Sequence, residues 1–391
     1  MRIGIDASCW WSRRGFGRFT RELLKAMFSM SNDHEFYLFV DRAPEPDMQV
    51  PGVHIVPVSI SKPVTEAAVA LGSRSVSDVL SFSRAASGTP LDIMFFPAVY
   101  SWFPVRPGLP SIVTMHDAIA EHFPEMIFPD KKGRLFWTLK MRLARWQATR
   151  VMTVSNAAKQ EIEKYLGIRP DKIDVVSEAA DPQFVQITDK ALLAVARKRT
   201  GVPADVRIIV YVGGLAPHKN IPGLLQGLVG AVKRGGLDDV HLVLVGDIKG
   251  DGFHSHFEEL SAIVDDEPDL QGRVHFTGYV SDEDLVALYS DALALTLPSF
   301  SEGFGLPAIE AMACGIPVLA SSAGSVPEVV GDAGLYFDPN DISQIADAIH
   351  LLASDNEVVN ALKKKALKRS CEFTWERAAG LTISYLENVL R

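Results

Sequence analysis

Short apolar runs alternate along this chain with longer stretches in which apolar residues recur at helical spacing. Buried parallel strands read as short apolar runs, and the helices that cover them repeat every three to four residues. The first half carries candidate strands at residues 3–5, 36–40, 54–58, 93–96, 112–115, 151–154 and 173–176. A second series follows at residues 208–212, 242–245, 274–276, 292–297, 318–320 and 335–337. The pattern predicts an α/β protein with two Rossmann-like, doubly wound domains.

Helices are expected between these strands, most clearly at residues 19–30, 157–166, 221–233, 283–289, 308–314 and 342–352. The stretch 181–205 contains Asp-Pro, Gly201 and Pro203, which favour an inter-domain connection around a short helix. We therefore expect domains at 1–190 and 191–372, and a last segment at 373–391 with a helix over 375–390. Ligands of doubly wound sheets bind beyond the carboxyl ends of the strands, so two facing domains would enclose a cleft.

Length, charge and cysteine usage narrow the class of protein. The 391 residues are enough for two or three domains. The formal net charge of −9 argues against nucleic acid as the main partner, because such proteins need a basic surface. Three widely spaced cysteines fit a reduced, intracellular protein. A strand begins at once and no run of 18 apolar residues occurs, so we expect a cytoplasmic protein without signal peptide or transmembrane helix.

The segment after the strand at 292–297 carries the most specific candidate chemistry. It reads S-F-S-E-G-F-G-L-P-A-I-E, with Glu302 in a Gly-rich loop and Glu310 in a helix that begins near Pro307. Gly303 and Gly305 would let the backbone approach a ligand, and a helix N-terminus attracts an anion. Carboxylates on either side of a phosphate site suit the hydroxyls of a sugar nucleotide. Each Glu alone could equally be a solvated loop or helix residue.

The spacing of Glu302 and Glu310 resembles the E-x7-E signature of retaining glycosyltransferases with the GT-B fold, in the large family four. Further motifs follow in the family's order, namely M-R-I-G-I-D-A, G-F-G-R-F-T-R-E-L, T-M-H-D, T-V-S-N, V-G-G-L-A-P-H-K-N and F-T-W-E-R-A-A. The resemblance covers nearly the whole chain. It implies a GT-B architecture, with an acceptor-side N-terminal domain facing a nucleotide-sugar-binding C-terminal domain across a cleft. It also implies that the last helix crosses back onto the N-terminal domain.

The resemblance further implies where the donor would bind. The loop with Gly15 and Gly17 would lie under the donor phosphates and sugar, and backbone groups near Tyr279 and Val280 would hold the nucleobase. Glu302 is expected to act on the hexose, and further donor contacts are expected from Gly303, Phe304, Gly305, Leu306 and Glu310. Gly15 and Gly17 do not form G-x-G-x-x-G, so a tight turn that needs glycine is the alternative for them.

Lys219 is the candidate cation for the donor diphosphate. We expect it in a first helical turn, where a lysine opposes the helix dipole unless an anion lies nearby; a solvated surface lysine is the alternative. Many members of the resembling family have arginine where this chain has Gly214, and another subgroup has arginine where it has His218. A protonated His218 would be a pH-dependent substitute, and Arg18 is a further candidate from across the cleft.

His116 and Asp117 follow the strand at 112–115, at the end that should face the cleft. A histidine there can bind a sugar hydroxyl or accept a proton, and in the resembling family this histidine contacts the donor sugar. A structural histidine is the alternative. Asp117 would either orient the imidazole or cap the next segment.

No metal site and no cofactor are expected. His254, His256 and Glu258 read more simply as the start of a solvated helix. The D-x-D at 282–284 follows Ser281 and reads as a helix cap with an acidic first turn. We predict a metal-independent enzyme with a nucleoside diphosphate sugar as co-substrate.

Residues 131–150 form a stretch with seven basic residues, no acidic ones and several aromatic side chains. Such a helix can lie on an anionic membrane surface, and lipid-linked sugars are common acceptors in the resembling family. Leu135, Leu139, Leu143 and Trp146 would also form a core face at helical spacing. The sequence leaves both interpretations of residues 131–150 open, a helix in peripheral contact with a membrane and a helix packed on the core.

The leading hypothesis is a retaining glycosyltransferase that moves a hexose from a nucleoside diphosphate sugar to a carbohydrate or lipid-linked saccharide. GDP-mannose is favoured, because the H-K-N context is closer to a P-R-K-N subgroup in which mannosyl transfer is common. A nucleotide-sugar epimerase of the same fold is one alternative. A non-catalytic sugar-nucleotide-binding partner in polysaccharide assembly is another.

Overall fold

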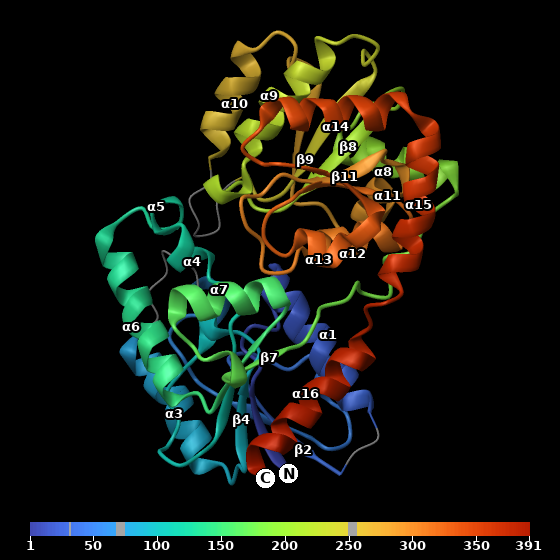
Figure 1. Cartoon of the computed structure of the whole chain (residues 1–391). Coiled ribbons are helices and arrows are strands. Elements are labelled where there is room, and N and C mark those ends of the chain that lie inside the picture. The colour runs from blue at the N-terminus through green and yellow to red at the C-terminus, as the bar shows by residue number, and fades with distance from the viewer. Residues whose placement is uncertain (31–32, 68–74, 249–255) are drawn as a thin grey trace. The chain divides into compact units, whose positions relative to one another are not determined.

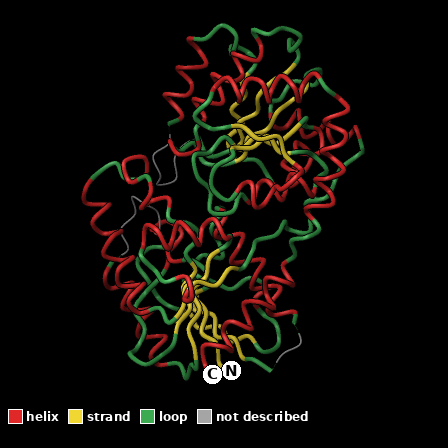
Figure 2. Tube along the Cα trace, in the orientation of Figure 1, coloured by secondary structure: helices red, strands yellow, loops and turns green. Residues whose placement is uncertain are grey.

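Figures 1 and 2 show the computed structural model, which describes residues 1–30, 33–67, 75–248 and 256–391. The chain divides into two compact units. The N-terminal unit contains Met1–Glu178 and Thr374–Arg391, and the C-terminal unit contains the described parts of Ala179–Gly250 and His254–Phe373. Each unit is built around one parallel sheet.

The sheet of the N-terminal unit has seven parallel strands in the order β3-β2-β1-β4-β5-β6-β7. The strands are β1 (Arg2–Asp6), β2 (Glu35–Val40), β3 (Val53–Pro57), β4 (Ile93–Phe96), β5 (Ser111–Thr114), β6 (Arg150–Thr153) and β7 (Ile173–Val175). Every residue of β4 and β5 is buried, because helices and loops cover both faces of a parallel sheet.

The helices of this unit pack around the sheet, and all but the C-terminal helix lie between strands in the chain (Figure 2). They are α1 (Gly15–Ser29), α2 (Val64–Ala67), α3 (Val76–Gly88), α4 (Ile119–His122), α5 (Pro124–Ile127), α6 (Lys131–Gln147), α7 (Asn156–Leu166) and α16 (Trp375–Leu390). The C-terminal helix α16 packs against α1 (Figure 1). The Trp375 and Phe19 rings form a T-shaped pair with centroids 6.0 Å apart. The chain therefore returns to its N-terminal unit, as predicted.

The C-terminal unit contains a six-stranded parallel sheet in the order β10-β9-β8-β11-β12-β13. Its strands are β8 (Arg207–Val212), β9 (Val240–Val245), β10 (Val274–Gly278), β11 (Ala294–Leu297), β12 (Val318–Ser321) and β13 (Gly334–Phe337). Its helices are α8 (Lys190–Thr200), α9 (Ile221–Val232), α10 (Phe257–Asp266), α11 (Asp282–Asp291), α12 (Leu306–Ala313), α13 (Val326–Val330), α14 (Ile342–Ser354) and α15 (Asn356–Ser370). Helices α9 and α14 pack together and bury Leu225, Leu228 and Ile345 in one apolar core with β8 and β9.

The predicted α/β class with two doubly wound parallel sheets is confirmed, and each candidate strand has an observed counterpart. The start of α1 differs from the expected one. Gly15 and Gly17 are not in a loop but in the first turn of a helix that Arg14 precedes in extended conformation. Helix α15 was not anticipated, because most of its residues are polar and only Val359, Leu362 and Ala366 are buried. The compact units meet at residues 178 and 179, whereas the sequence-based domain boundary lies at 190.

Glycines lie where three neighbouring strands of the C-terminal sheet end. Gly213 follows β8, Gly246 follows β9, and Gly278 closes β10. The Gly246 N–H donates to the Gly278 carbonyl at 3.1 Å, and the Gly213 N–H donates to Val245 at 3.0 Å. A Cβ atom on Gly246 would lie 2.0 Å from the Gly213 oxygen. Glycine at 246 is therefore required for the close backbone packing from which the following loops start.

We predict that Gly246→Ala destabilises the C-terminal unit by about 1–3 kcal/mol or more, the usual cost of overpacking a tight site. Gly214→Ala is the matched control in the loop after β8, because a Cβ there meets nothing within 4 Å. Calorimetric unfolding should show a lower transition temperature for Gly246→Ala and an unchanged one for Gly214→Ala. Equal transition temperatures in the two variants would contradict the steric explanation.

Candidate active site

The topological switch point of the C-terminal sheet lies between β8 and β11. These strands are neighbours, although the chain passes outward through β9 and β10 before it returns to add β11, β12 and β13 on the other side. Doubly wound sheets bind ligands at the carboxyl ends of the strands at such a point. Lys219 follows β8, Glu302 follows β11, and the two side chains meet.

Lys219 does not lie in a first helical turn, as the sequence suggested. It ends a short 3-10 turn, Pro217–Lys219, and α9 begins only at Ile221. The residue between them, Asn220, has a left-handed backbone with φ 53°, which is unusual for a residue other than glycine. Lys219 therefore lies before the first turn of α9, and its role is inferred from its contacts.

Lys219 forms a bidentate ion pair with Glu302. Its Nζ atom lies 2.8 Å from Oε1 and 2.7 Å from Oε2, and the Ser299 hydroxyl donates to Oε1 at 2.5 Å. Burial alone would raise the pKa of Glu302, but the Lys219 ammonium and the Ser299 hydroxyl outweigh it and hold this pKa below its ordinary value. Glu302 is therefore ionised at neutral pH. The Lys219 side chain is 19% exposed and the Glu302 side chain 11%, so neither is a solvated surface residue.

His218 is not the pH-dependent cation that the sequence allowed. Burial and the neighbouring Lys219 charge lower its pKa to about 3, although Glu302 acts in the opposite direction. The imidazole is therefore neutral throughout the physiological range. Its Nδ1 atom is buried without a hydrogen-bond partner among the described residues, which leaves one polar atom beside Lys219 unsatisfied.

Asn220 fixes the loop after β8 against the loops after two other strands. Its Nδ2 atom donates to the Pro298 carbonyl at 3.2 Å and to the Pro339 carbonyl at 2.7 Å. The His218 carbonyl accepts from the Phe300 N–H at 2.9 Å, which ties the β8 loop to the β11 loop. Sequence reasoning assigned no role to Asn220, since only its left-handed conformation and these contacts reveal one.

The backbone at Glu302 is held from the other side by the turn after β12. The Ser325 hydroxyl donates to the Glu302 carbonyl at 2.9 Å, and the Ser325 N–H donates to the same oxygen at 3.3 Å. Gly324 has φ 65° and lies so close that a Cβ there would approach the Glu302 nitrogen to 2.8 Å. The turn after β12 therefore fixes the position of the Glu302 backbone.

Helix α12 begins at Leu306, directly after Gly305 in a left-handed conformation with φ 92°, and Pro307 lies in its first turn. Glu310 is buried in this helix, and the Tyr289 hydroxyl lies 3.5 Å from its Oε2 atom. Phe304 is buried against the edge of Phe373. The solvated-helix alternative for Glu310 is therefore wrong, and the E-x7-E segment belongs to the interior of the unit.

Tyr279 and Val280 come directly after β10, which extends to Gly278. Val280 is buried and Tyr279 is exposed. They follow a strand on the opposite side of β8 from β11. The described contacts do not join them to the ion pair, and a contact with the nucleobase stays a prediction.

The N-terminal unit has its own switch point, between β1 and β4. The N-terminal turn of α1 follows β1, and a Cβ on Gly17 would lie 2.1 Å from the Ser12 carbonyl oxygen. Gly17 therefore has a packing role, whereas a Cβ on Gly15 would meet nothing within 4 Å. Arg18 lies in the same first turn of α1.

His116 follows β5 and is held at both ring nitrogens. Nε2 lies 3.0 Å from the Pro97 carbonyl oxygen, and Nδ1 lies 3.4 Å from Glu178 Oε1. A carbonyl can only accept, so Nε2 carries a hydrogen. Asp117 does not orient the ring; it accepts from the Ile119 N–H at 3.0 Å and so caps the next turn. Glu178 is the partner that sequence reasoning missed, because 62 residues separate it from His116.

The residues whose spacing resembles that of metal ligands have structural roles in the described part of the chain. Ser281 caps α11 by accepting from the Asp284 N–H at 3.1 Å, and Asp284 pairs with Arg199 at 3.0 Å. His256 precedes α10 and pairs with Glu259 at 2.8 Å, whereas His254 lies outside the described residues. The described residues contain no group of three potential ligands that could hold a metal ion. Metal independence stays a prediction.

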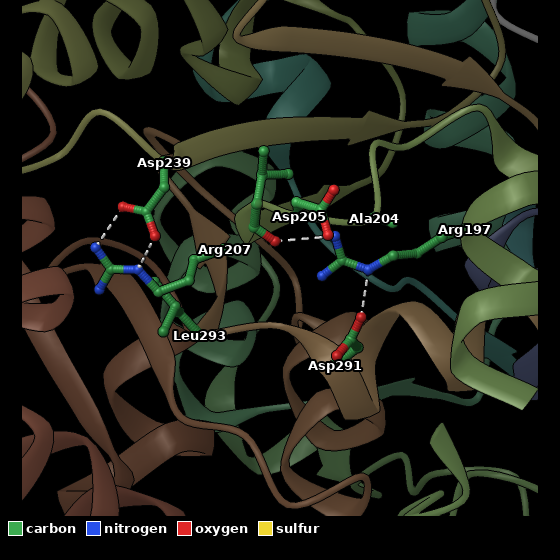
Figure 3. A pocket seen from close by; sticks show the side chains of 8 residues that line it. Arg197, Ala204, Asp205, Arg207, Asp239, Asp291 and Leu293 are labelled. Carbon is green, nitrogen blue, oxygen red and sulfur yellow. Dashed lines mark hydrogen bonds and ion pairs between the residues drawn. The ribbon is translucent and has the colours of Figure 1, made fainter. Parts of the chain in front are cut away.

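A separate polar hollow lies at the opposite, amino-terminal edge of the same sheet (Figure 3). Arg207 pairs with Asp239 through two contacts of 2.7 Å, and Arg197 pairs with Asp291 and donates to the Val206 carbonyl at 2.9 Å. These arginines join strand starts to neighbouring segments. The ion pairs around the hollow hold these segments together. Ligands of doubly wound sheets bind at the opposite edge, where the strands have their carboxyl ends.

Comparison with known proteins gives these geometries a context. The family described as Glycosyl transferases group 1 matches residues 194–369, and the family described as Glycosyltransferase Family 4 matches residues 13–184. O-antigen chain mannosyltransferase B of Escherichia coli is 31% identical over 287 residues, 70% of this chain and 69% of that protein. MMP alpha-(1->4)-mannosyltransferase of Mycolicibacterium hassiacum is 31% identical over 296 residues, 72% of this chain and 66% of that protein.

The serotype-specific mannosyltransferase WbdA of Escherichia coli is 28% identical over 284 residues, which span 72% of this chain but only 34% of that longer protein. Among solved structures, sucrose-phosphate synthase from Thermosynechococcus elongatus has a TM-score of 0.75 at 20% identity and covers 100% of this chain and 99% of its own. Anabaena HepE in complex with UDP-glucose has a TM-score of 0.74 at 18% identity and covers 99% of both chains.

The two sheets and the structural likeness define the GT-B fold, and the matched family models show a glycosyltransferase. The family matches and the 31% identical mannosyltransferase place it more closely: the chain belongs to glycosyltransferase family 4.

We predict that His218 makes the stability of the C-terminal unit depend on pH. The unfolded histidine binds a proton near pH 6.5 and the folded one only near pH 3, so stability is complete above pH 6.5 and falls as the pH drops between these values. From pH 7.5 to pH 4.5 the histidine contributes a loss of about 2–3 kcal/mol. Calorimetric unfolding of wild type and His218→Gln should show this extra loss in the wild type alone. Parallel pH profiles would mean that His218 is not held neutral.

Proposed function

We propose that this protein is a retaining hexosyltransferase that moves mannose from GDP-mannose to a saccharide or lipid-linked saccharide acceptor in polysaccharide assembly. The observation that carries the proposal is the partly buried Lys219–Glu302 ion pair at the switch point of the C-terminal sheet. A fixed cation beside the Gly-rich turn that opens α12 suits a diphosphate, because helix amides and an ammonium both attract phosphate oxygens.

The chemical demand of the reaction fits this charge arrangement. As the bond from the anomeric carbon to the diphosphate breaks, negative charge grows on the leaving oxygen, where Lys219 and the first amides of α12 would stabilise it. The acceptor hydroxyl attacks the anomeric carbon from the leaving-group face. Its oxygen forms the new glycosidic bond, and its proton passes to the departing phosphate. No carboxylate nucleophile is needed in this sequence, and the anomeric configuration is retained.

The remaining site residues are assigned as donor contacts within the same proposal. Glu302 acts on the hexose and Glu310 on the ribose, with Gly303, Phe304, Gly305 and Leu306 forming the phosphate-binding turn. Tyr279 and Val280 hold the base. His116 contacts the donor sugar, and Gly15, Gly17 and Arg18 approach its phosphates. His218 contributes as a neutral polar group next to Lys219 and adds no charge.

Mannose is favoured by two curated relatives at 31% identity, which are named as mannosyltransferases. The bound UDP-glucose is a property of Anabaena HepE, whose 18% identity supports the fold alone. Guanine as the base rests on the resemblance of the H-K-N segment to the P-R-K-N subgroup.

We predict that Glu302→Gln and Glu310→Gln change the binding of free GDP in opposite directions. Glu302 occupies Lys219, so its neutralisation releases the ammonium for phosphate and should tighten GDP severalfold while turnover falls. Loss of a charged hydrogen bond to the ribose should weaken GDP about tenfold or more in Glu310→Gln, since such bonds contribute about 1.5–3 kcal/mol. Isothermal titration calorimetry measures both, with exposed Glu357→Gln as the isosteric control. Equal weakening in both variants would refute the division between hexose and ribose.

We predict that GDP-mannose stabilises the protein and is consumed only when an acceptor is added. A donor at 100 times its Kd stabilises by about 2.7 kcal/mol, which thermal shift detects readily. Chromatography of the products tests the reaction with GDP-mannose and UDP-glucose. A new sugar nucleotide formed from donor alone would indicate an epimerase. Turnover of UDP-glucose with none of GDP-mannose would overturn the donor and leave glycosyl transfer standing.

A further inference from the structure

Helix α6 turns large apolar side chains outward. Trp146 is 84% exposed, Phe136 70% and Leu135 68%, and Leu139 and Leu143 are also exposed. Trp146 is the most exposed large apolar residue in the described part of the chain. The core-face interpretation of this apolar stripe is therefore wrong. Exposed apolar area concentrated in this way marks an interaction surface rather than the scattered exposure of ordinary surfaces.

The inward face of α6 consists of other residues. Met141 and Ala144 are buried, and Trp137 is half-buried next to the small cluster of Ile119, Ile127 and Phe128. The Trp137 Nε1 atom donates to Glu121 at 2.7 Å. Gln147 Nε2 donates to the Val105 carbonyl at 2.8 Å. The helix is thus anchored along its length, and its outward stripe is a fixed surface.

The apolar stripe lies beside a basic one. Leu135, Leu139, Leu143 and Trp146 follow at spacings of four, four and three, so they share one side of the helix. Lys131, Arg134, Arg142 and Arg145 repeat at multiples of the helical period on the adjoining side, and all four are exposed. Of the seven basic residues in 131–150, Lys140 is engaged with the Tyr100 carbonyl and Arg150 with Asp174, and Arg134 forms an exposed ion pair with Glu125 at 3.3 Å.

We propose that the outward face of α6, the stripe Leu135–Phe136–Leu139–Leu143–Trp146 with its flanking Lys and Arg residues, docks the N-terminal unit on an anionic bilayer surface. Adjacent apolar and basic stripes on one helix match the interface of anionic lipids, where aromatic and leucine side chains enter the acyl boundary and basic heads remain among the phosphates. A chain with a net charge of −9 keeps this segment free of acidic residues, so the complementarity is local. No helix in the described residues is long and apolar enough to cross a membrane, and docking on the surface needs none.

Co-sedimentation of the full chain with vesicles tests the proposal. Vesicles of 30% phosphatidylglycerol in phosphatidylcholine should bind the protein, pure phosphatidylcholine should bind it much less, and added salt should weaken binding. Phe136→Ser with Trp146→Ser should lower the partition coefficient at least tenfold. Lys131→Gln with Arg142→Gln should lower it by roughly fivefold per charge.

Matched control variants distinguish binding through this surface from non-specific binding of the protein to vesicles. Val185→Ser with Leu192→Ser removes two exposed apolar residues elsewhere, and Lys364→Gln with Lys368→Gln removes two exposed charges on α15. Both control pairs should bind as wild type does. Equal loss in the controls, or equal binding to neutral vesicles, would overturn the proposal. So would absent vesicle binding together with a dimer, seen by sedimentation, that Phe136→Ser with Trp146→Ser dissociates. The measurement needs no donor, so its failure would leave the proposed transfer reaction untouched.

Discussion

Parallel strand pairing is the constraint on which the rest of this structure depends. Because all strands of a sheet point the same way, every loop that leaves a carboxyl end emerges at one edge. The reversal of strand order between β8 and β11 brings Lys219 and Glu302 together from positions 83 residues apart. In the N-terminal unit the same rule brings His116 beside Pro97, and Cys9 Sγ to 3.1 Å from Ser101 Oγ. Residues that no local motif connects thus become neighbours.

Partial burial of the Lys219–Glu302 pair at the switch point of the C-terminal sheet costs free energy, because both charges lose water. Desolvation of two charges offsets most of their attraction, so a buried ion pair is a weak source of stability, whereas loss of one partner leaves the other charge stranded. Around it, Asn220, Ser299 and Ser325 hold both loops through directed hydrogen bonds. Neutral His218 leaves Lys219 as the positive charge of its loop. Such preorganisation has a purpose if a phosphate is to meet an ammonium that is already in position.

The strands could be predicted from the sequence because their burial leaves a clear apolar pattern. Several details of the site could not, because the local backbone conformations that set them leave no such pattern. Core strands of parallel sheets are buried on both faces, so their apolar runs can be read directly. The start of α1 was missed, because glycine disfavours helix interiors but is tolerated in the first turn. Lys219 was placed one element too late, since a left-handed asparagine leaves no signal in the periodicity. For α6 the spacing of the apolar residues predicted an apolar stripe, but not whether the stripe faces the core or the solvent. The buried face of the helix consists of Met141 and Ala144 instead.

One candidate site residue in each unit already has partners within that unit. Lys219 has Glu302, and His116 has Pro97 and Glu178. A ligand at either place therefore binds by exchanging partners, and its affinity is the difference between the contacts it makes and those it breaks. At Lys219 only an anion compensates for the displaced carboxylate, because a neutral hydroxyl would leave a partly buried ammonium poorly paired. If Lys219 binds the donor as proposed, the pair would disfavour free sugars and favour a sugar that carries a diphosphate.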